Sequence, residues 1–316
     1  MSITTSSVLP APVQQTLSYK LLSVPTPYMI HKIPAMLKNM PRNGGTDLRM
    51  RRYNPLATAT VPLGNSGVYP PAQNLTAIDI DAKMDFYGTY VILNEQVTLQ
   101  NQDPVLNEAA LRLGVSLRQT EDELTRNMLA STAAFINAVG GTNGDNPTEL
   151  ARSDVDEVIK TLVTANAYTL ATGTEGADKF GSSPVRDSFF VMANSQLIGD
   201  LERVTGFVAK IQYPNQDKTL TPEWGSISNT RWLLSSIGST TPNASLNGED
   251  VFNCFVAGLE AYCCVEQDGY SAQFIYRPPI YDGPLALNAS VGYKFAEVPR
   301  ITNDAWIVNL RCTLSL

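Results

Sequence analysis

Residues 103–141, DPVLNEAALRLGVSLRQTEDELTRNMLASTAAFINAVGG, carry the longest helical pattern in the chain. Asp103 is a favourable N-cap and Pro104 a favourable first helical residue. Apolar and small residues then recur at spacings of three and four up to Val139, and Gly140-Gly141 supplies a stop. The pattern predicts one helix over 103–139, roughly 54 Å long at 1.5 Å per residue. Such a length is unusual in a globular domain and indicates a specialised architecture.

Two strands are predicted before this helix. Residues 49–53 read as the first strand, and residues 78–86 as its return, because apolar residues there alternate with Asp79, Asp81 and Asp85. Residues 87–93 are more uniformly apolar, and we expect them to enter a core.

The first 45 residues predict an extended arm. Six prolines prevent a long helix, yet apolar residues are frequent between them. An extended apolar segment must be buried on a surface, and a neighbouring subunit of an oligomer would supply one.

Residues 150–270 predict a mixed α/β region. Ser153 and Asp156 resemble a capping box ahead of a helix, and a buried strand is expected at 188–192. Further helices are expected over 197–204 and, after Asn247-Gly248, over 251–259, whereas residues 206–248 give no clear pattern. Strands follow at 271–276, 289–295 and 306–314.

Composition limits the function classes. The 316 residues are 43% hydrophobic and 17% charged, which suits a folded core and not a disordered chain. A net charge of −7 argues against a basic nucleic-acid binder, and a single histidine argues against most metalloenzymes and His-dependent hydrolases. We expect no signal peptide and no membrane span. The cysteines, Cys254, Cys263, Cys264 and Cys312, form no CxxC pair and are expected to be buried reduced thiols.

The charge is unevenly distributed. Residues 1–60 hold seven basic residues and one acidic residue, a net charge of +6, so the remainder carries −13. A basic segment on an acidic body is typical of an interaction region. The candidates for contacts between subunits are therefore Arg49, Arg51 and Arg52 on one side and Asp79, Asp81 and Asp85 on the other. Alternation places Arg49 and Arg51 on one strand face and Arg52 on the other, and a protein partner is favoured over nucleic acid.

No catalytic, cofactor-binding or metal-binding residue is predicted. Asp79, Asp81 and Asp85 fit the solvated face of a hairpin better than a cation site. The Gly140–Gly144 segment follows a helix and lacks the lysine of a phosphate loop. His31 has no acidic neighbour in the sequence, which predicts a surface or interface histidine.

Four stretches spread over most of the chain carry a resemblance to a known family. The first is Leu75-Thr-Ala-Ile78 followed by Phe86-Tyr-Gly-Thr-Tyr90, and the second runs from Asp103-Pro-Val-Leu106 through Leu113-Gly-Val115 to Thr120-Glu-Asp-Glu-Leu124. The third is Ser188-Phe-Phe-Val191, and the fourth is Gly248-Glu-Asp-Val-Phe252 with Val256-Ala-Gly-Leu-Glu-Ala261. With the order of the elements, these stretches resemble the major capsid proteins of tailed bacteriophages, which have the Hong Kong 97-type fold, and within them the podovirus-like N-four branch.

The resemblance implies an α+β capsid subunit that is a structural protein without a cofactor. Its parts would be an N-terminal arm (1–45), an extended loop (46–85), a peripheral domain with a long spine helix (86–150), an axial domain (151–269) and returning strands (270–316). It also implies hexamers and pentamers that close an icosahedral shell around double-stranded DNA in the virion, after assembly in the cytoplasm of a bacterial host. Scaffold, portal or decoration proteins would be further partners, and no membrane would be involved.

Two other function classes remain open on the sequence alone. One is an encapsulin-type shell, which has a similar fold but encloses a protein cargo. The other is a soluble α/β enzyme that uses Asp79, Asp81 and Asp85.

Overall fold

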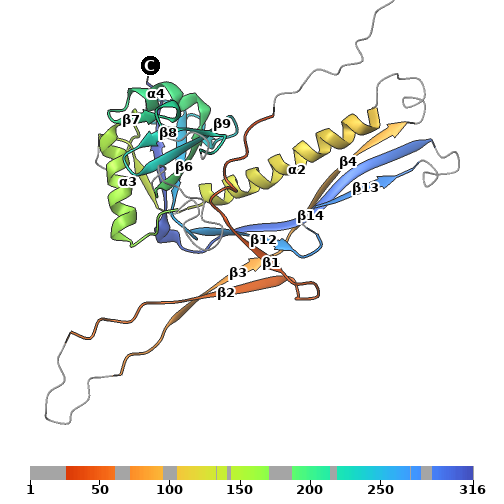
Figure 1. Cartoon of the computed structure of the whole chain (residues 1–316), viewed down its shortest axis with the longest axis horizontal. Helices are drawn as coiled ribbons and strands as arrows, with labels where there is room; N and C mark the ends of the chain where they lie inside the picture. The colour runs from red at the N-terminus through yellow and green to blue at the C-terminus, as the bar shows by residue number, and fades with distance from the viewer. Residues whose placement is uncertain are drawn as a thin grey trace, which may run out of the picture.

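The computed structural model describes residues 26–60, 72–94, 105–132, 134–140, 144–170, 187–213, 219–270, 272–278 and 287–315. It is an α+β structure, as the sequence predicts. Figure 1 shows an α/β body, a long helix that runs beside an extended sheet, and a two-stranded hairpin that projects away from both. None of the helices in these ranges is long and apolar enough to cross a bilayer.

The body is built on an eight-stranded sheet with the order β5-β15-β11-β6-β9-β8-β7, and β10 pairs with β11. Its strands are β5 (Phe135–Asn137), β6 (Phe189–Asn194), β7 (Phe207–Ala209), β8 (Glu223–Ile227), β9 (Thr230–Ser235), β10 (Thr240–Thr241), β11 (Val251–Ala257) and β15 (Ile307–Cys312). Residues 206–248, which gave no clear pattern, therefore contain four strands of this sheet.

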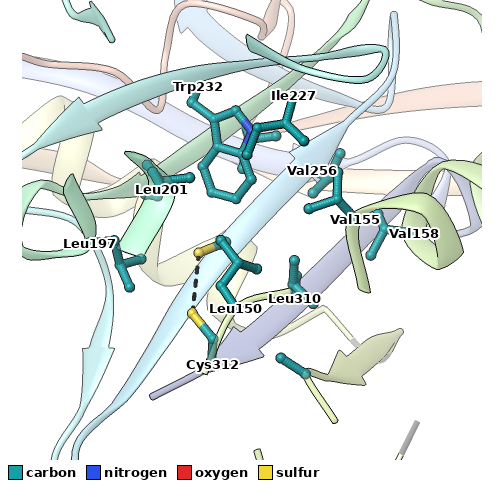
Figure 2. Close-up of a cluster of buried hydrophobic side chains, with 14 of the residues drawn as sticks. Leu150, Val155, Val158, Leu197, Leu201, Ile227, Trp232, Val256, Leu310 and Cys312 are labelled. Carbon is teal, nitrogen blue, oxygen red and sulfur yellow. Dashed lines mark hydrogen bonds between the residues drawn. The ribbon is translucent and has the colours of Figure 1, made fainter. Parts of the chain in front are cut away.

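Helices α3 (Arg152–Thr164) and α4 (Ile198–Arg203) cover one face of the body sheet. Figure 2 shows the core between them, in which Val155 and Val158 of α3 and Leu201 of α4 face Trp232 and Leu310 of the sheet. All five side chains are buried. This packing fixes the helices on the sheet through the hydrophobic effect.

A second, extended sheet is organised by the long strand β14 (Asn288–Ile301). The first half of β14 pairs with β4 (Phe86–Asn94) and β13 (Gln273–Arg277), and its second half pairs with β12 (Tyr262–Gln267). Strand β1 (Met36–Met40) adds to β12 in parallel. The hairpin of β2 (Asp47–Tyr53) and β3 (Ala77–Lys83) forms a separate two-stranded sheet.

The predicted long helix is present as α2 (Val105–Ala130), but it is shorter at its end than expected. Ser131 and Thr132 donate to carbonyls three residues back and close the helix, and residues 135–137 form β5. Phe135 and Val139 fit a helical period, yet β5 pairs in parallel with β15 and buries Ile136 in the body core. Tertiary pairing therefore overrides the helical spacing there. The predicted start at Asp103 and Pro104 lies outside the described residues.

The helix expected over 251–259 is wrong, because residues 251–257 form strand β11. Every residue of β11 is buried, since the strand lies in the middle of the sheet with layers on both faces. A strand buried on both faces has no alternation, and its continuous apolar run also satisfies a helical spacing.

The helix predicted after Ser153 is confirmed as α3, but its cap is different. Asp154 accepts a hydrogen bond from the backbone N–H of Ala151 at 3.0 Å, so Ala151 is the N-cap, and its methyl side chain returns no hydrogen bond. Asp154 also accepts from the backbone of Val139 at 3.1 Å, which ties the start of α3 to the segment after β5.

Helix α2 lies along the first half of β14 with a buried apolar stripe. Leu113 and Leu117 pack against Val291, Tyr293 and Phe295. This arrangement confirms a buried seam on the helix, and the charged residue Glu121, four positions after Leu117, is also buried on it.

Truncating the seam is expected to be costly. We expect Leu117→Ala to lower the free energy of unfolding by about 2–5 kcal/mol, because Leu117 is 4% exposed and leaves a cavity. The exposed Glu123 on the same helix is the matched control, and Glu123→Gln should change stability little. Urea denaturation of the two variants measures the difference, and equal effects would contradict the buried seam.

Candidate functional site: assembly surfaces around a buried charged junction

The β2–β3 hairpin brings together four of the six charged residues singled out in the sequence. The antiparallel register places Arg49 opposite Asp81 and Arg51 opposite Asp79. Each pair is bidentate, with Nε to Oδ1 distances of 2.7 Å in both cases. The hydrogen bonds from Arg51 and Arg49 lower the pKa of Asp79 and Asp81, respectively. These pairs are exposed to solvent, so they define the register of the hairpin more than its stability.

The other two charged candidates are not part of this ladder. Arg52 points to the opposite face, as the alternation predicts, and its Nη1 donates to the backbone carbonyl of Thr302 at 3.3 Å. Asp85 follows β3 and is exposed. The carboxylates of Asp79 and Asp81 are held by guanidinium groups, and the described residues contain no cluster of three or more ligand side chains suited to a metal ion.

The inner face of the hairpin attaches it to the extended sheet. Met50 and Ala82 of the hairpin are buried against Cys263, Val265 and Val298 of β12 and β14. One face of the hairpin is thus apolar and buried at its base, and the other carries the ion pairs.

Strand β4 does not enter a core as expected, because only Leu93 is buried among its nine residues. Tyr87 and every second residue after it in β4 face α2. Phe86, Tyr90 and Ile92 therefore lie on the opposite face of the sheet. Their exposed fractions are 69%, 68% and 58%. Ile275 of β13 lies on the same face, because Ile275 and Tyr90 are both paired with Gly292 of β14, one on each side of it.

We call this exposed surface the open sheet face, made of Phe86, Tyr90, Ile92 and Ile275. Between Tyr90 and Ile275 lies a hollow of about 460 Å³ over Gly88, Ser290 and Gly292. A side chain at Gly292 would meet Tyr90 Cβ at 2.7 Å, so the small residues create the hollow. Contiguous apolar residues around a hollow mark a surface that binds another protein.

A buried charged junction joins the N-terminal segment to the helix and the sheet. The Lys32 ammonium lies 2.8 Å from Glu266 of β12 and 3.0 Å from Glu297 of β14. It also lies 3.4 Å from Glu121 of α2, which is paired with Arg118 at 3.1 Å. Three elements that are distant in sequence are therefore held by one cation.

The pKa values at the junction reflect this arrangement. Burial alone would lower the pKa of Lys32, but the hydrogen bond to Glu266 and the charges of Glu297 and Glu121 outweigh it and raise the pKa. Burial raises the pKa of Glu297, and Lys32 offsets only part of that shift. Lys32 therefore stays protonated, whereas the buried surroundings of Glu297 favour the neutral form of its carboxyl group.

His31 is not at the surface, which corrects the sequence-based expectation. Its side chain is fully buried, and its Nδ1 lies 2.7 Å from Oδ2 of Asp122. The backbone N–H of His31 donates to the other oxygen of Asp122, also at 2.7 Å. Tyr262 completes the site by donating its hydroxyl to the carbonyl of His31. The acidic partner was missed because it lies 91 residues away.

The sequence did hold one signal for this junction. Glu121, Asp122 and Thr125 fall on the helical stripe that continues Leu113 and Leu117. Charged residues on a buried stripe require partners, which indicates a buried ion-pair site. Arg126, four residues after Asp122, does not pair with it and instead donates to the carbonyl of Ile237 at 2.8 Å.

The thiol of Cys264, next to this junction, makes stability pH-dependent. Burial and the charge of Glu297 raise its pKa from 9.0 to about 12. The unfolded thiol ionises above pH 9 while the folded one stays protonated, so this stability is complete below pH 9 and is lost as pH rises toward 12. We expect wild type to lose about 1.4 kcal/mol more than Cys264→Ala between pH 8 and pH 10 in urea denaturation. Parallel profiles for the two proteins would contradict the buried thiol.

Comparison with known proteins rests on structure. No protein-family model matches the chain, and no curated protein matches it. The capsid of Ralstonia phage GP4 is similar over 100% of this chain and 99% of its own, with a TM-score of 0.70 and 12% identity. The head structure of Helicobacter pylori bacteriophage KHP40 is similar over 100% and 98%, with a TM-score of 0.67 and 10% identity.

A third similar structure is the capsid of Cyanophage P-SCSP1u, with a TM-score of 0.66 and 11% identity, covering 96% of this chain and 94% of that one. At these identities the likeness concerns the fold, and it extends over nearly the whole of each chain. The chain therefore has the fold of bacteriophage capsid proteins, the Hong Kong 97-type fold that the four stretches of sequence predicted.

Proposed function

We propose that this chain is the major capsid protein of a tailed bacteriophage. It assembles into hexamers and pentamers of an icosahedral shell that encloses double-stranded DNA, and its role is structural and not enzymatic. The fold shared with phage capsids over almost the full length supports this proposal. The podovirus-like N-four branch stays a prediction.

The observation that carries the proposal is the open sheet face. A lone subunit would expose Phe86, Tyr90 and Ile92 to water, which opposes the hydrophobic effect. The hairpin exposes apolar residues of its own, among them Tyr53 and Ile78. The hairpin and the extended sheet point in different directions in Figure 1, and we propose that the hairpin of one copy packs on the open sheet face of the next. Contacts of this head-to-tail kind generate rings.

The proposed parts of the subunit keep the boundaries inferred from the sequence. Residues 1–45 form the arm, 46–85 the extended loop, 86–150 the peripheral domain, 151–269 the axial domain and 270–316 the returning strands. The shell is the capsid of a virion assembled in the bacterial cytoplasm, and scaffold, portal or decoration proteins are its further partners.

Electron microscopy of the purified protein tests the proposal. We expect closed shells from wild type and only small particles from the double variant Tyr90→Ser, Ile92→Ser, with unchanged circular dichroism. Leu246→Ser is the control, because Leu246 is 82% exposed on the body and away from the open sheet face. Small particles from wild type would overturn the proposal. Shells that hold protein cargo in place of DNA would assign an encapsulin-type compartment.

The role of the charged hairpin residues between subunits is a separate proposal. Arg49 and Arg51 already pair with Asp81 and Asp79 within the chain, so simple charge reversal would damage the hairpin itself. A fourfold swap, Arg49→Asp, Asp81→Arg, Arg51→Asp and Asp79→Arg, keeps the ladder but inverts its polarity. Reduced yield of empty shells supports a contact between subunits. A normal yield would restrict these four residues to a role within the hairpin.

A further inference from the structure

The body carries an apolar groove that is separate from the assembly surfaces described above. The groove has a volume of about 880 Å³ and lies between α4, β8 and the end of β9. Its apolar lining comes from Tyr28, Ile198, Ile211 and Trp224. Ile211 is 77% exposed and Trp224 is 40% exposed, so the groove is open and apolar. Such a combination on the surface marks a binding site for an apolar segment.

The described part of the N-terminal segment begins inside this groove. Thr26, Pro27 and Tyr28 line it. The hydroxyl of Ser235, at the end of β9, donates to the backbone carbonyl of Tyr28 and anchors the chain there. The residues that precede Thr26 are therefore tethered at the groove, which gives them a high effective concentration at this site.

The sequence before Thr26 has the composition that the groove requires. Residues 17–24 read LSYKLLSV, in which five of eight residues are large and apolar. Lys20 is the only charged residue among the first 30. Segments this apolar gain free energy when they leave water for an apolar surface.

One charged group in the groove complements Lys20. Glu202 lies in the lining and accepts a hydrogen bond from the indole N–H of Trp224 at 3.2 Å. Within the described ranges no lysine or arginine forms an ion pair with Glu202, whereas the neighbouring Glu223 is paired with Arg231. Lys210 also lines the groove, but its ammonium donates to the backbone carbonyl of Leu220 at 2.7 Å, so a lysine beside Glu202 would form an ion pair that Lys210 does not make.

We propose that this groove binds residues 17–25 of the same chain, with Leu21, Leu22 and Val24 on the apolar lining and Lys20 near Glu202. The interaction folds the start of the arm back onto its own body. It needs no neighbouring subunit and does not depend on the proposed function.

Trypsin digestion of the full chain tests this inference, because Lys20 is the only trypsin site before Lys32. We expect Trp224→Ala to speed cleavage at Lys20 by about tenfold, since cleavage follows the population of the released arm. The matched control is Leu246→Ala, which removes an exposed apolar side chain outside the groove and should leave the rate unchanged. Circular dichroism checks that both variants fold, and equal cleavage rates in wild type and Trp224→Ala would overturn the proposal.

Dilution of the wild-type protein distinguishes the source of the bound segment. Protection by the same chain is independent of protein concentration, so the rate at Lys20 should stay constant over about a hundredfold range. A rate that rises on dilution would assign the groove to the arm of a second copy and overturn binding within the chain.

Discussion

Lys32→Met is expected to lower the free energy of unfolding by about 3–5 kcal/mol, the cost of leaving buried charges without their partner. Glu297 is 2% exposed and would face the Glu266 carboxylate without a cation, whereas Glu121, which is 6% exposed, would keep only Arg118 as its partner. Lys83→Met is the matched control, since Lys83 is exposed and has no ion pair in the described ranges. Urea denaturation followed by circular dichroism measures both variants.

The pH dependence of this deficit follows from Glu297. Its pKa is raised in the folded state, so the folded protein takes up the proton first as the pH falls. Protonation removes one of the three clustered negative charges, and the deficit of Lys32→Met should therefore shrink toward pH 5. A second variant, Lys32→Met with Glu297→Gln, should regain part of the stability at pH 7. A deficit as small as that of Lys83→Met would show that the junction does not hold the fold.

Deletion of residues 1–40 is expected to abolish folding, in contrast to the sequence-based expectation of an extended arm that is buried on a neighbouring subunit. Residues 26–40 belong to the core of their own subunit, because Ile30 and Met40 are buried and strand β1 pairs with β12. The deletion would also remove Lys32 and thus the cation of the charged junction. Each buried aliphatic side chain alone is worth about 2–5 kcal/mol.

Deletion of residues 1–25 should have a different outcome. The core contacts of Ile30, Lys32 and Met40 remain, so we expect cooperative unfolding near the wild-type midpoint. We also expect no closed shells by electron microscopy, because the sequence predicts that the apolar arm contacts a neighbouring subunit. Normal shells from this variant would remove the arm from assembly. A folded, soluble protein after deletion of residues 1–40 would contradict the burial of the segment after Thr26.

Strands with one buried face were predictable from the sequence. The alternation of Ile80 and Ala82 with Asp79 and Asp81 predicted β3 and the exposure of its acidic residues. A two-residue period shows which side chains lie on the buried face of a strand and which lie on the exposed face. In β11 all seven residues are buried, so no period distinguished strand from helix. The break after Ala130 was missed since it depends on pairing between β5 and β15, which are far apart in sequence.

The charged hairpin could be predicted from the sequence, whereas the buried junction could not. Arg51 and Asp79 are 28 residues apart on paired strands, and their alternation was sufficient to place them on exposed faces. His31 and Lys32 meet carboxylates 89 to 265 residues away, and only the folded chain brings these together. The open sheet face was mistaken for a core because apolar composition does not distinguish an exposed apolar surface from an interior.

The continuity of β14 has a mechanical consequence. One unbroken strand of 14 residues is hydrogen-bonded to β4 and β13 in its first half and to β12 in its second. Tension between the tip of the extended sheet and the base of the hairpin therefore runs along the strand axis. Ladder hydrogen bonds lie perpendicular to an antiparallel strand, so axial tension loads many of them in shear at once and does not open them one at a time. Strand β14, the longest strand in the part of the chain that the structure describes, therefore resists stretching between its two ends.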